Sequence, residues 1–578
     1  MGALVVVALA VAVWGYFELR HARDAVTEAD EALSRLRTAV VDRDDDARRK
    51  ALDDFDDAAR DAGGAGGPVW SLMKQMPAVG DDVTALQAVG RSLEGTSSAL
   101  PHLLDAYDGL DEVTDGSRID LDAVTGLRAP VAEALSGFGD ARAGLADVLT
   151  SGLSSSVRTR VENYRTSLDS LVTWLDAGID VIDVLPRVLG GEGERTYLMI
   201  VQNNAEIRAT GGLPGSWSVV HAADGVLTMG EQGSAQDFTI YPEDAPVGDL
   251  TDEELAVYGP EIGRYFQDPG FTPDFPRAAE IFNAFWAAEH PDVPLDGVMA
   301  LDPVTLGYVM EATGPVDVDG YELSADNVIQ SLLQQVYLNL DPDRQDEFFE
   351  HAAKAVFDDV TADYPELTTL LDGLVRAGTE GRLLFAPFDP TVADAISGTR
   401  VAGDLVEEGE VLPEGQENVA HVDIGLNDAT GSKMSYFLRY EADADVSWCV
   451  DDVQLITGSL TMSQDIDVET AALLPSYVTG GGKYGTEPGR QLVFVRLYGP
   501  VGGTIEEISI NGRPEEITKV DQVNGRPVVN LAVDVFRAED DRITWTMKAP
   551  PGQTDGVRLG ITPSVIAGDG NVTVPSAC

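Results

Sequence analysis

The run from Thr196 to Gly212 constrains the fold of this chain more than any other feature. It begins with Thr196–Val201, a hydrophobic stretch typical of a buried β-strand. Two asparagines, a glutamate, an arginine and two glycines then follow within a few residues, before a second β-like run begins at Trp217. In α/β proteins, a strand that ends in amides, charges and a glycine turn often carries side chains that face a ligand. The sequence therefore predicts an α/β domain with a site at this strand end.

The candidate ligand-binding residues at this strand end are Asn203, Asn204, Glu206 and Arg208. Amides and carboxylates suit sugar hydroxyls, and an arginine pairs with a phosphate or a uronate. The structural alternative is that the amides satisfy loop backbone, while Arg208 bridges Glu206 or an aspartate. A long segment with little regular structure, residues 239–275, is also expected, and such loops often border sites.

Four more positions are candidates for a site or an interface. Arg344 and Gln345 open a predicted helix and are candidates for the same ligand site, the alternative for Arg344 being a bridge to a neighbouring aspartate. Asp302 precedes Pro303, which is typical of a helix N-cap followed by proline, so it is only a minor candidate for a metal ligand. Lys433 lies between two predicted domains in the sequence and is a candidate interdomain contact.

A chain of 578 residues is too long for one hydrophobic core and predicts several domains. Apolar residues spaced alternately by four and three from Val157 to Ile182 indicate a helical bundle seam. Gly190–Gly193 is read as a hinge, after which strand-like and helix-like runs alternate. The predicted fold class is multidomain, with these parts: a transmembrane or signal-anchor helix (1–19), a helical bundle or stalk (20–190), an α/β domain (194–395) and an antiparallel β-sandwich (418–578).

The apolar segment Ala3–Phe17 is the basis for the predicted anchor. As a helix it spans about 22 Å, which is short of the roughly 30 Å hydrocarbon core of a bilayer. No small-residue cleavage site follows it, so an uncleaved anchor is favoured over a removed signal peptide. Arg20 and Arg23 follow the span and argue against export of the rest, unless a basic leader precedes the given start. The predicted location is the cell membrane, single-pass, with the bulk of the chain extracytoplasmic.

Charge and cysteine content narrow the function classes. The chain has 39 Lys and Arg against 98 Asp and Glu, a formal net charge of −59, so nucleic-acid binding is disfavoured. Its two cysteines, Cys449 and Cys578, both lie in the β-rich last quarter. In an exported protein they predict one disulfide that ties down the C-terminus, and two unrelated thiols are the alternative.

Several motifs carry a family resemblance. The stretch Arg195–Gly212 resembles a bacterial family catalogued as domain of unknown function 4012. Further matching stretches are Asp296–Pro303, Thr313–Val316, Leu426–Met434, Pro475–Gly481 and Leu497–Pro500. The resemblance implies a membrane-anchored, envelope-facing protein of actinobacterial type, associated with surface-polysaccharide systems and without a settled activity.

The order of elements is also distantly similar to the LytR-CpsA-Psr transferases, which attach glycopolymers from a polyprenyl-pyrophosphate carrier to the cell wall. Asp341–Gln345 would match their Asp…Arg-Gln element. Val336–Leu340 occupies the place of their arginine pair, but neither arginine is present. Because pyrophosphate binding needs positive, fork-shaped donors, this departure weakens the transferase interpretation.

The sequence thus favours a protein that binds or handles a surface glycopolymer, or its polyprenyl-linked precursor, with little or no catalysis and no cofactor. Its expected partners are that polymer and the membrane, through the N-terminal helix, and no nucleic acid. One alternative is an active phosphotransferase that uses Arg208, Arg344 and a divalent metal; another is a structural or receptor module. The sequence contains no zinc-type histidine pair, nucleophile elbow or Walker motif, and whether the protein is an enzyme stays open.

Overall fold

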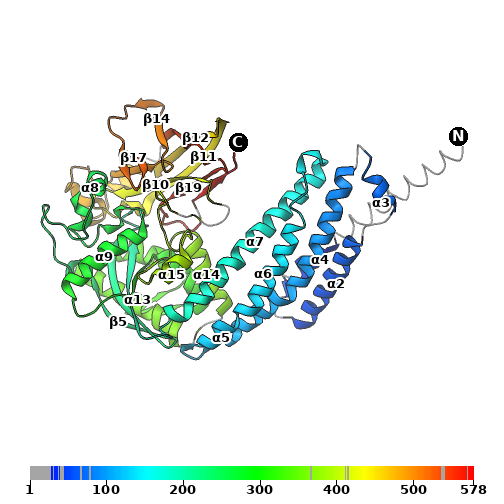
Figure 1. The fold of residues 1–578 in the computed structure, drawn as a ribbon. Helices are drawn as coiled ribbons and strands as arrows, with labels where there is room; N and C mark the ends of the chain where they lie inside the picture. Colours follow the sequence, from blue (N-terminus) through cyan, green and yellow to red (C-terminus); the bar gives the residue numbers. More distant parts are fainter. Residues whose placement is uncertain are drawn as a thin grey trace. The chain divides into compact units, whose positions relative to one another are not determined.

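The chain forms two compact units in a computed structural model (Figure 1). The N-terminal unit extends to Pro186, and the C-terminal unit comprises Arg187–Cys578 together with Gly116–Arg118. The structure describes residues 28–29, 31–36, 38–39, 44–64, 68–76, 80–362, 364, 367–410, 412, 416–535, 540–568 and 570–578.

The N-terminal unit is built from helices around an alanine-rich core. Its helices are α2 (Asp45–Gly63), α3 (Pro68–Met73), α4 (Gly80–Gly109), α5 (Leu121–Gly126), α6 (Arg128–Ala143) and α7 (Ser155–Val188). A short hairpin, β1 (Thr114–Asp115) and β2 (Arg118–Ile119), lies between α4 and α5 in the sequence. Phe55, Phe138 and Leu145 are fully buried in the core, and the apolar residues of the predicted seam on α7 also pack against it.

Small residues let these helices approach closely. A Cβ on Gly90 of α4 would lie 2.3 Å from the carbonyl oxygen of Ala62 on α2. A Cβ on Gly137 of α6 would lie 2.7 Å from the Cβ of Ala99 on α4. Because neither distance leaves room for a side chain, glycine at these positions sets the spacing of the helices.

The predicted fold class and localisation require a correction. In the part of the chain that the structure describes, no helix has both the length and the apolar character needed to cross a membrane. The long helices α2, α4, α7 and α13 (Pro342–Ala362) all carry charged side chains at short intervals. This finding contradicts the membrane helix of the predicted fold class and the predicted single-pass membrane location; residues 1–19, to which that helix was assigned, lie outside the described residues. The fold is one of mixed helices and several sheets.

The C-terminal unit begins with a five-stranded sheet of order β5-β4-β3-β6-β9. Its strands are β3 (Arg195–Asn203), β4 (Leu213–Ala223), β5 (Val226–Ser234), β6 (Gly297–Leu301) and β9 (Leu384–Pro387). Only β3 and β6 pair in parallel, and the other neighbours are antiparallel. Leu198 and Ile200 of β3 pack with helix α9 (Phe275–Glu289), whereas Tyr197 and Met199 pack on the other face. Burial on both faces explains why this strand is uniformly hydrophobic.

Helices and short elements cover this sheet and connect its strands. They are α8 (Asp252–Tyr258), α10 (Pro303–Thr313), β7 (Val316–Val318), β8 (Tyr321–Leu323), α11 (Val328–Gln330), a π-helical turn (Ser331–Gln335), α12 (Val336–Asn339), α13, α14 (Leu367–Thr379) and α15 (Pro390–Ile396), with short 3-10 turns at Ala235–Asp237, Pro260–Gly263 and Pro269–Phe271. The sequence predicts one continuous helix over Ala325–Leu338, but the π-helical turn interrupts it. The segment 239–275 contains only α8 and short 3-10 turns, in keeping with the irregular loop expected there.

Two further sheets enclose one hydrophobic core in the β-rich part. The first has the order β16-β17-β13-β10-β19-β20 and the second β11-β12-β18-β14-β15. Their strands are β10 (Ala420–Asp428), β11 (Leu438–Val450), β12 (Val453–Gln464), β13 (Gln491–Tyr498), β14 (Thr504–Ile510), β15 (Arg513–Glu515), β16 (Asp521–Val523), β17 (Arg526–Val535), β18 (Asp541–Lys548), β19 (Val557–Ile561) and β20 (Val572–Val574), and two short helices, α16 (Val468–Ala471) and α17 (Ser476–Thr479), follow β12. The sequence predicts an antiparallel sandwich. In the structure β10 and β19, the first and next-to-last strands of this part, are neighbours that run in the same direction, so this one pair is parallel.

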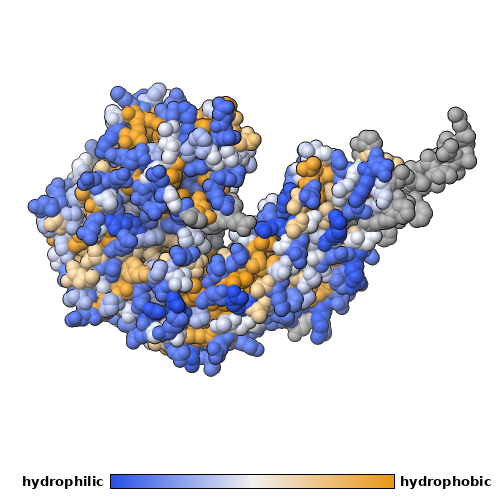
Figure 2. All heavy atoms as spheres, viewed as in Figure 1, coloured by the Kyte–Doolittle hydropathy of each residue, from blue (hydrophilic) through white to orange (hydrophobic). Residues whose placement is uncertain are grey.

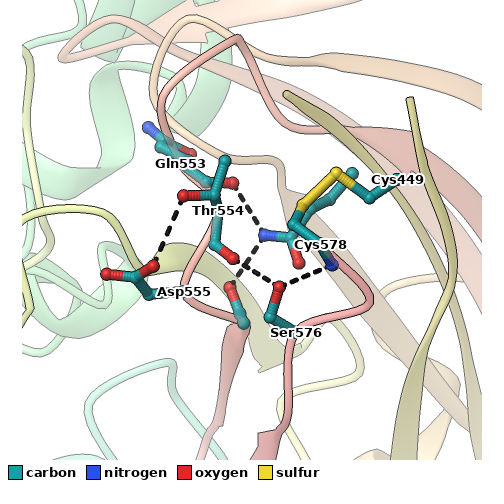
Figure 3. The surroundings of a disulfide bond; sticks show 8 residues. Cys449, Gln553, Thr554, Asp555, Ser576 and Cys578 are labelled. Atoms are coloured by element: carbon teal, nitrogen blue, oxygen red, sulfur yellow. Dashed lines mark hydrogen bonds between the residues drawn. A yellow bond between two sulfur atoms is a disulfide. The ribbon is translucent and has the colours of Figure 1, made fainter. Parts of the chain in front are cut away.

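A disulfide joins Cys449, near the end of β11, to the terminal residue Cys578, with a Cα–Cα distance of 5.0 Å (Figure 3). This is the pairing that the sequence predicts. Ser576 adds local support, since its hydroxyl accepts a hydrogen bond from the Cys578 backbone at 2.8 Å and donates one to the Thr554 carbonyl. The C-terminus is therefore held to the β-rich part by both a covalent bond and hydrogen bonds.

Candidate functional site

The predicted site at the end of β3 is buried. Asn203 is 9% exposed, Asn204 1%, Glu206 7% and Arg208 5%. After β3 the chain turns through Gly211, whose φ of 133° suits glycine, and the backbone of Gly212 donates to the Gln202 side chain at 3.0 Å. The two glycines therefore form the turn, and the four polar residues lie inside the C-terminal unit rather than on its surface.

Arg208 lies between two carboxylates. Its Nη2 is 3.4 Å from Glu206 Oε1 and 3.3 Å from Asp268 Oδ1, and its guanidinium lies 5.0 Å from the ring centre of Phe271. Its Nη1 donates to the carbonyls of Ile207 and Asp428. Asp268 and Phe271 come from the irregular segment 239–275, so that segment does border the strand end. These contacts match the structural alternative for Arg208, a bridge to an acidic residue.

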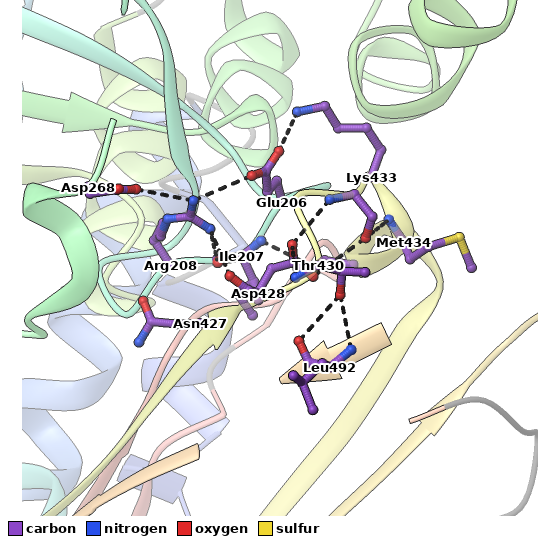
Figure 4. Close-up of polar contacts among 12 residues, drawn as sticks. Glu206, Ile207, Arg208, Asp268, Asn427, Asp428, Thr430, Lys433, Met434 and Leu492 are labelled. Carbon is purple, nitrogen blue, oxygen red and sulfur yellow. Dashed lines mark hydrogen bonds and ion pairs between the residues drawn. The ribbon is translucent and has the colours of Figure 1, made fainter. Parts of the chain in front are cut away.

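Glu206 also binds Lys433 from the β-rich part, whose Nζ donates to its Oε2 at 2.7 Å. Figure 4 shows Glu206 between Arg208 and Lys433. We call Glu206, Arg208, Asp268 and Lys433 the ion cluster. Burial acts to raise the pKa of Glu206, but Lys433 and Arg208 together lower it below its usual value. Lys433 thus connects the β-rich part to the end of β3, and both lie in the same compact unit.

In the same surroundings the pKa of Asp268 is raised, whereas that of Glu206 is lowered. Burial raises the pKa of Asp268 to about 6; Arg208 opposes this change, and the negative charge of Glu206 adds to it. Burial and Glu206 also raise the pKa of the neighbouring Asp428. Three carboxylates thus share two cations, and the pKa values of two of them, Asp268 and Asp428, are raised.

The two asparagines have structural partners. Asn203 donates to the Tyr337 hydroxyl and accepts from the Ala205 backbone at 3.0 Å. Asn204 donates to Asp302 at 3.0 Å. Asp302 is the N-cap of α10, where it accepts from the backbone of Thr305 at 2.8 Å, as the sequence indicates.

Asp302 also accepts from Arg382, at 2.9 Å. The Arg382 side chain is fully buried, and it donates further to Glu380 and to the backbone carbonyls of Ser564 and Ile566. Arg382 therefore links the strand-end region to the loop that follows β19. Sequence reasoning did not identify Arg382, because an arginine after a helix carries no local sign of a distant partner.

Arg344 and Gln345 do not join the ion cluster. Arg344 is exposed in the first turn of α13, and its backbone donates to the Asp341 carbonyl at 3.0 Å. Gln345 is 3% exposed, and its amide donates to the Leu340 carbonyl at 2.8 Å. The structure therefore brings Asn203, Asn204, Glu206, Arg208 and Asp302 into one region and places Arg344 elsewhere on the surface.

An exposed aromatic surface lies beside the ion cluster. Tyr477 is 47% exposed and Tyr484 59% exposed. Both pack against the turn Thr430–Lys433: the Tyr477 ring lies 5.9 Å from Lys433 Nζ, and a Cβ on Gly431 would lie 2.7 Å from the Tyr484 ring. We call Tyr477 and Tyr484 the tyrosine surface. The stretch Pro475–Gly481, noted in the sequence for its family resemblance, contains the first of them.

Two cavities bear on ligand size. One, of about 90 Å³, lies between the segment after α15 and strands β10 and β19. The other, of about 10 Å³, is lined by residues that include Tyr337, Lys433 and Tyr436. Pockets for drug-sized ligands hold roughly 300–1,000 Å³, so neither cavity has room for a polyprenyl chain.

A metal site would need several acidic, histidine or cysteine side chains close together. Among the described residues, no three His, Cys, Asp or Glu side chains are grouped so that they could hold a metal ion. Asp302, the minor candidate, already accepts from a backbone N–H, a threonine hydroxyl, Asn204 and Arg382. Its oxygens are thus used by internal donors.

Comparison with known proteins matches part of the chain to a family. Residues 192–337 fit the model of a family described as "Protein of unknown function (DUF4012)". The match covers strands β3 to β8 and the strand-end residues, so the resemblance seen in Arg195–Gly212 is supported over this segment. Comparison with curated proteins and with solved structures gave no match.

Proposed function

We propose that this protein binds a surface glycopolymer without acting on it chemically, and that the polymer contacts the tyrosine surface. The observation that carries the proposal is the exposure of the Tyr477 and Tyr484 rings beside one turn. Sugar rings have an apolar C–H face that stacks on an aromatic ring, and tyrosine adds a hydroxyl for hydrogen bonding. Tyrosine also loses little conformational entropy when it is bound.

Binding without catalysis is favoured by the state of the strand-end charges. General acid–base chemistry needs a titrating group within hydrogen-bonding reach of the substrate. Glu206 is held by Arg208 and Lys433, and Arg208 is held by Glu206 and Asp268. These residues therefore support the turn against which the tyrosine surface packs, and they are poorly placed to meet a substrate.

The polymer as ligand class is inferred from the family resemblance, which implies an association with bacterial surface polysaccharides. The distant similarity to the LytR-CpsA-Psr transferases fits the same substrate class. A phosphotransferase is less well supported, because Arg208 is buried among carboxylates and Arg344 lies apart from it.

Calorimetric titration of the full chain with soluble bacterial polysaccharides, one neutral, one rich in uronate and one rich in phosphate, tests the proposal. We expect at least one to bind, and the double variant Tyr477→Ala/Tyr484→Ala to bind it about tenfold more weakly or worse. The matched control is Tyr321→Ala on β8, because Tyr321 is 55% exposed but lies away from this surface.

The control variant should bind like the parent protein, and the double variant should keep the parent melting temperature. The proposal is overturned if no polysaccharide binds. It also fails if Tyr321→Ala weakens binding as much as the double variant does.

A further inference from the structure

We propose that the cavity bounded by the segment after α15 and by strands β10 and β19 binds a small oxyanion, namely a carboxylate or a phosphate group. Its lining includes Arg400, His421, Asp423 and Arg558. The inference does not depend on the tyrosine surface, which none of these residues contacts in the structure as described. It assigns a second binding site to the C-terminal unit.

The strand pairing brings the polar groups of this cavity together. β10 and β19 are parallel neighbours, with His421 opposite Arg558 and Asp423 opposite Gly560. A Cβ on Gly560 would lie 2.2 Å from Asp423 Oδ1 and 3.6 Å from Arg400 Nη1, so glycine here allows Asp423 and Arg400 to approach the same strand position. His421 and Arg558 from the two adjacent strands and Arg400 from the loop therefore line the same cavity.

His421 supplies a buried group that lacks a partner. His421 is 8% exposed, and its ring nitrogen Nε2 has no hydrogen-bond partner among the described residues. Buried polar atoms in folded proteins nearly always have a partner. Burial lowers the pKa of His421 to about 4, Arg526 and Arg558 add to this effect, and Asp423 opposes it. The ring is thus neutral at pH 7 and can donate one N–H to an anion.

The charge balance around the cavity favours an anion. Asp423 is neutralised by Arg526, whose Nη1 lies 2.8 Å from its Oδ2. Asp404, the other acidic residue of the lining, accepts from the backbone of Gly398 at 2.9 Å and keeps its negative charge, which is opposed by Arg558 in the same lining. Arg558 uses one of its five N–H donors on Gln416, at 3.4 Å. The His421 ring and the remaining N–H donors of Arg558 therefore complement a negative ligand in this cavity.

The volume limits the ligand. At about 90 Å³ the cavity is well below the roughly 300–1,000 Å³ of pockets for drug-sized ligands. It suits a small group such as a carboxylate or a phosphate. The ligand is therefore either a free oxyanion or the charged group of a larger molecule whose remainder stays outside.

Thermal shift and calorimetry of the full chain at constant ionic strength test the site, with inorganic phosphate, acetate and glucuronate as probes and glucose as the neutral control. We expect a saturable rise of the melting temperature with at least one anion and none with glucose. Binding of phosphate alone would indicate a phosphate group, and binding of acetate and glucuronate a carboxylate. Binding of acetate without glucuronate would indicate a free ion. In the variant Arg558→Gln the affinity should fall about tenfold or more.

The matched control is Arg513→Gln, because Arg513 is an exposed arginine on β15 of the same unit. It should bind like the parent protein, and so should the Tyr477→Ala/Tyr484→Ala variant, which separates this site from the polysaccharide proposal. A second variant, His421→Phe, should also lose binding, so the test does not depend on the folding of Arg558→Gln alone. The inference is overturned if no anion binds saturably, or if Arg513→Gln and Arg558→Gln weaken binding equally.

Discussion

The two units use charged residues in different ways. In the N-terminal unit, pairs such as Arg60–Asp56 and Arg128–Asp183 join side chains that are each more than 40% exposed. In the C-terminal unit, Arg208, Arg382 and Lys433 have side chains no more than 10% exposed, and each contacts a carboxylate. Exposed pairs contribute little to stability, whereas a buried charge that loses its partner is strongly destabilising.

This difference suggests that charged residues have one role on the surface of the helices and another inside the C-terminal unit. The charged pairs on the helices are exposed, and Figure 2 shows hydrophilic residues over much of the drawn face, with apolar patches between them. Buried charge in the C-terminal unit joins segments that are far apart in the sequence, such as Glu206 and Lys433. The predictions that follow test this contrast, beginning with the largest expected effect.

Arg208→Met should destabilise the C-terminal unit by about 3–5 kcal/mol, because it leaves Glu206 and Asp268 buried with less compensating charge. Arg60→Met, on the exposed face of α2, should leave the N-terminal unit unchanged within error. Urea titration followed by hydrogen exchange of peptides from each unit measures both. Equal effects of the two variants would remove the contrast between the units.

Cys578→Ser should lower the stability of the C-terminal unit by about 2–4 kcal/mol, because the disulfide closes a long loop in the unfolded chain. The two cysteines are 129 positions apart in the sequence. Reduction of the parent protein should have the same effect, and exchange in helices α4 and α6 should not change. A loss of protection in those helices would show that the units are not independent in stability.

The contribution of Asp268 to the stability of the C-terminal unit should fall as pH rises from about 4 to about 6, because its pKa is raised from 3.8 to about 6 in the folded protein. His421, whose pKa is lowered to about 4, contributes in the opposite direction over the same range. The folded state holds the Asp268 proton more tightly, so the contribution of Asp268 is full below pH 4 and is lost as pH rises through 6. The change is at most about 3 kcal/mol, at about 1.4 kcal/mol per pKa unit.

Asp268→Asn should remove this part of the pH dependence. The control Asp394→Asn, at an exposed position on α15, should keep it. Denaturation midpoints measured between pH 4 and pH 7 distinguish the two outcomes. An unchanged slope in Asp268→Asn would assign the proton to another carboxylate of this region.

Within the helical unit, Gly90→Ala and Gly139→Ala should have opposite effects. Gly90 faces the backbone of Ala62, so an added methyl group overpacks the contact and should cost about 1–3 kcal/mol. A Cβ added to Gly139, inside α6, would have nothing within 4 Å, so alanine there should stabilise the helix by roughly 0.5–1 kcal/mol. Thermal unfolding monitored by circular dichroism measures both. Stabilisation by both substitutions would show that packing between α2 and α4 is loose.

Local sequence patterns predicted many helices and strands correctly, but they did not predict which distant residues contact one another. The hydrophobic run before Asn203 forms β3, and the strand-like run at Trp217 forms β4. The hydrophobic spacing of Ala325–Leu338 is typical of a helix but does not reveal the π-helical turn at Ser331–Gln335. Arg208 and Arg344, candidates for one ligand site, are not together in the structure, because Arg208 is buried and α13 presents Arg344 to solvent.

The sequence by itself determined the buried strand β3, the helical seam on α7 and the N-cap at Asp302, and it limited any disulfide within the chain to the pair Cys449 and Cys578. Each of these features depends on the spacing of residues along the chain or on the chemistry of neighbouring residues. For the disulfide, each cysteine has one other cysteine in the sequence to pair with. The tertiary structure alone decided that Arg208 pairs with Asp268 and that His421, Arg400 and Arg558 surround one cavity. A buried charge takes whichever partner the packing of distant segments brings near, and no local pattern specifies that packing.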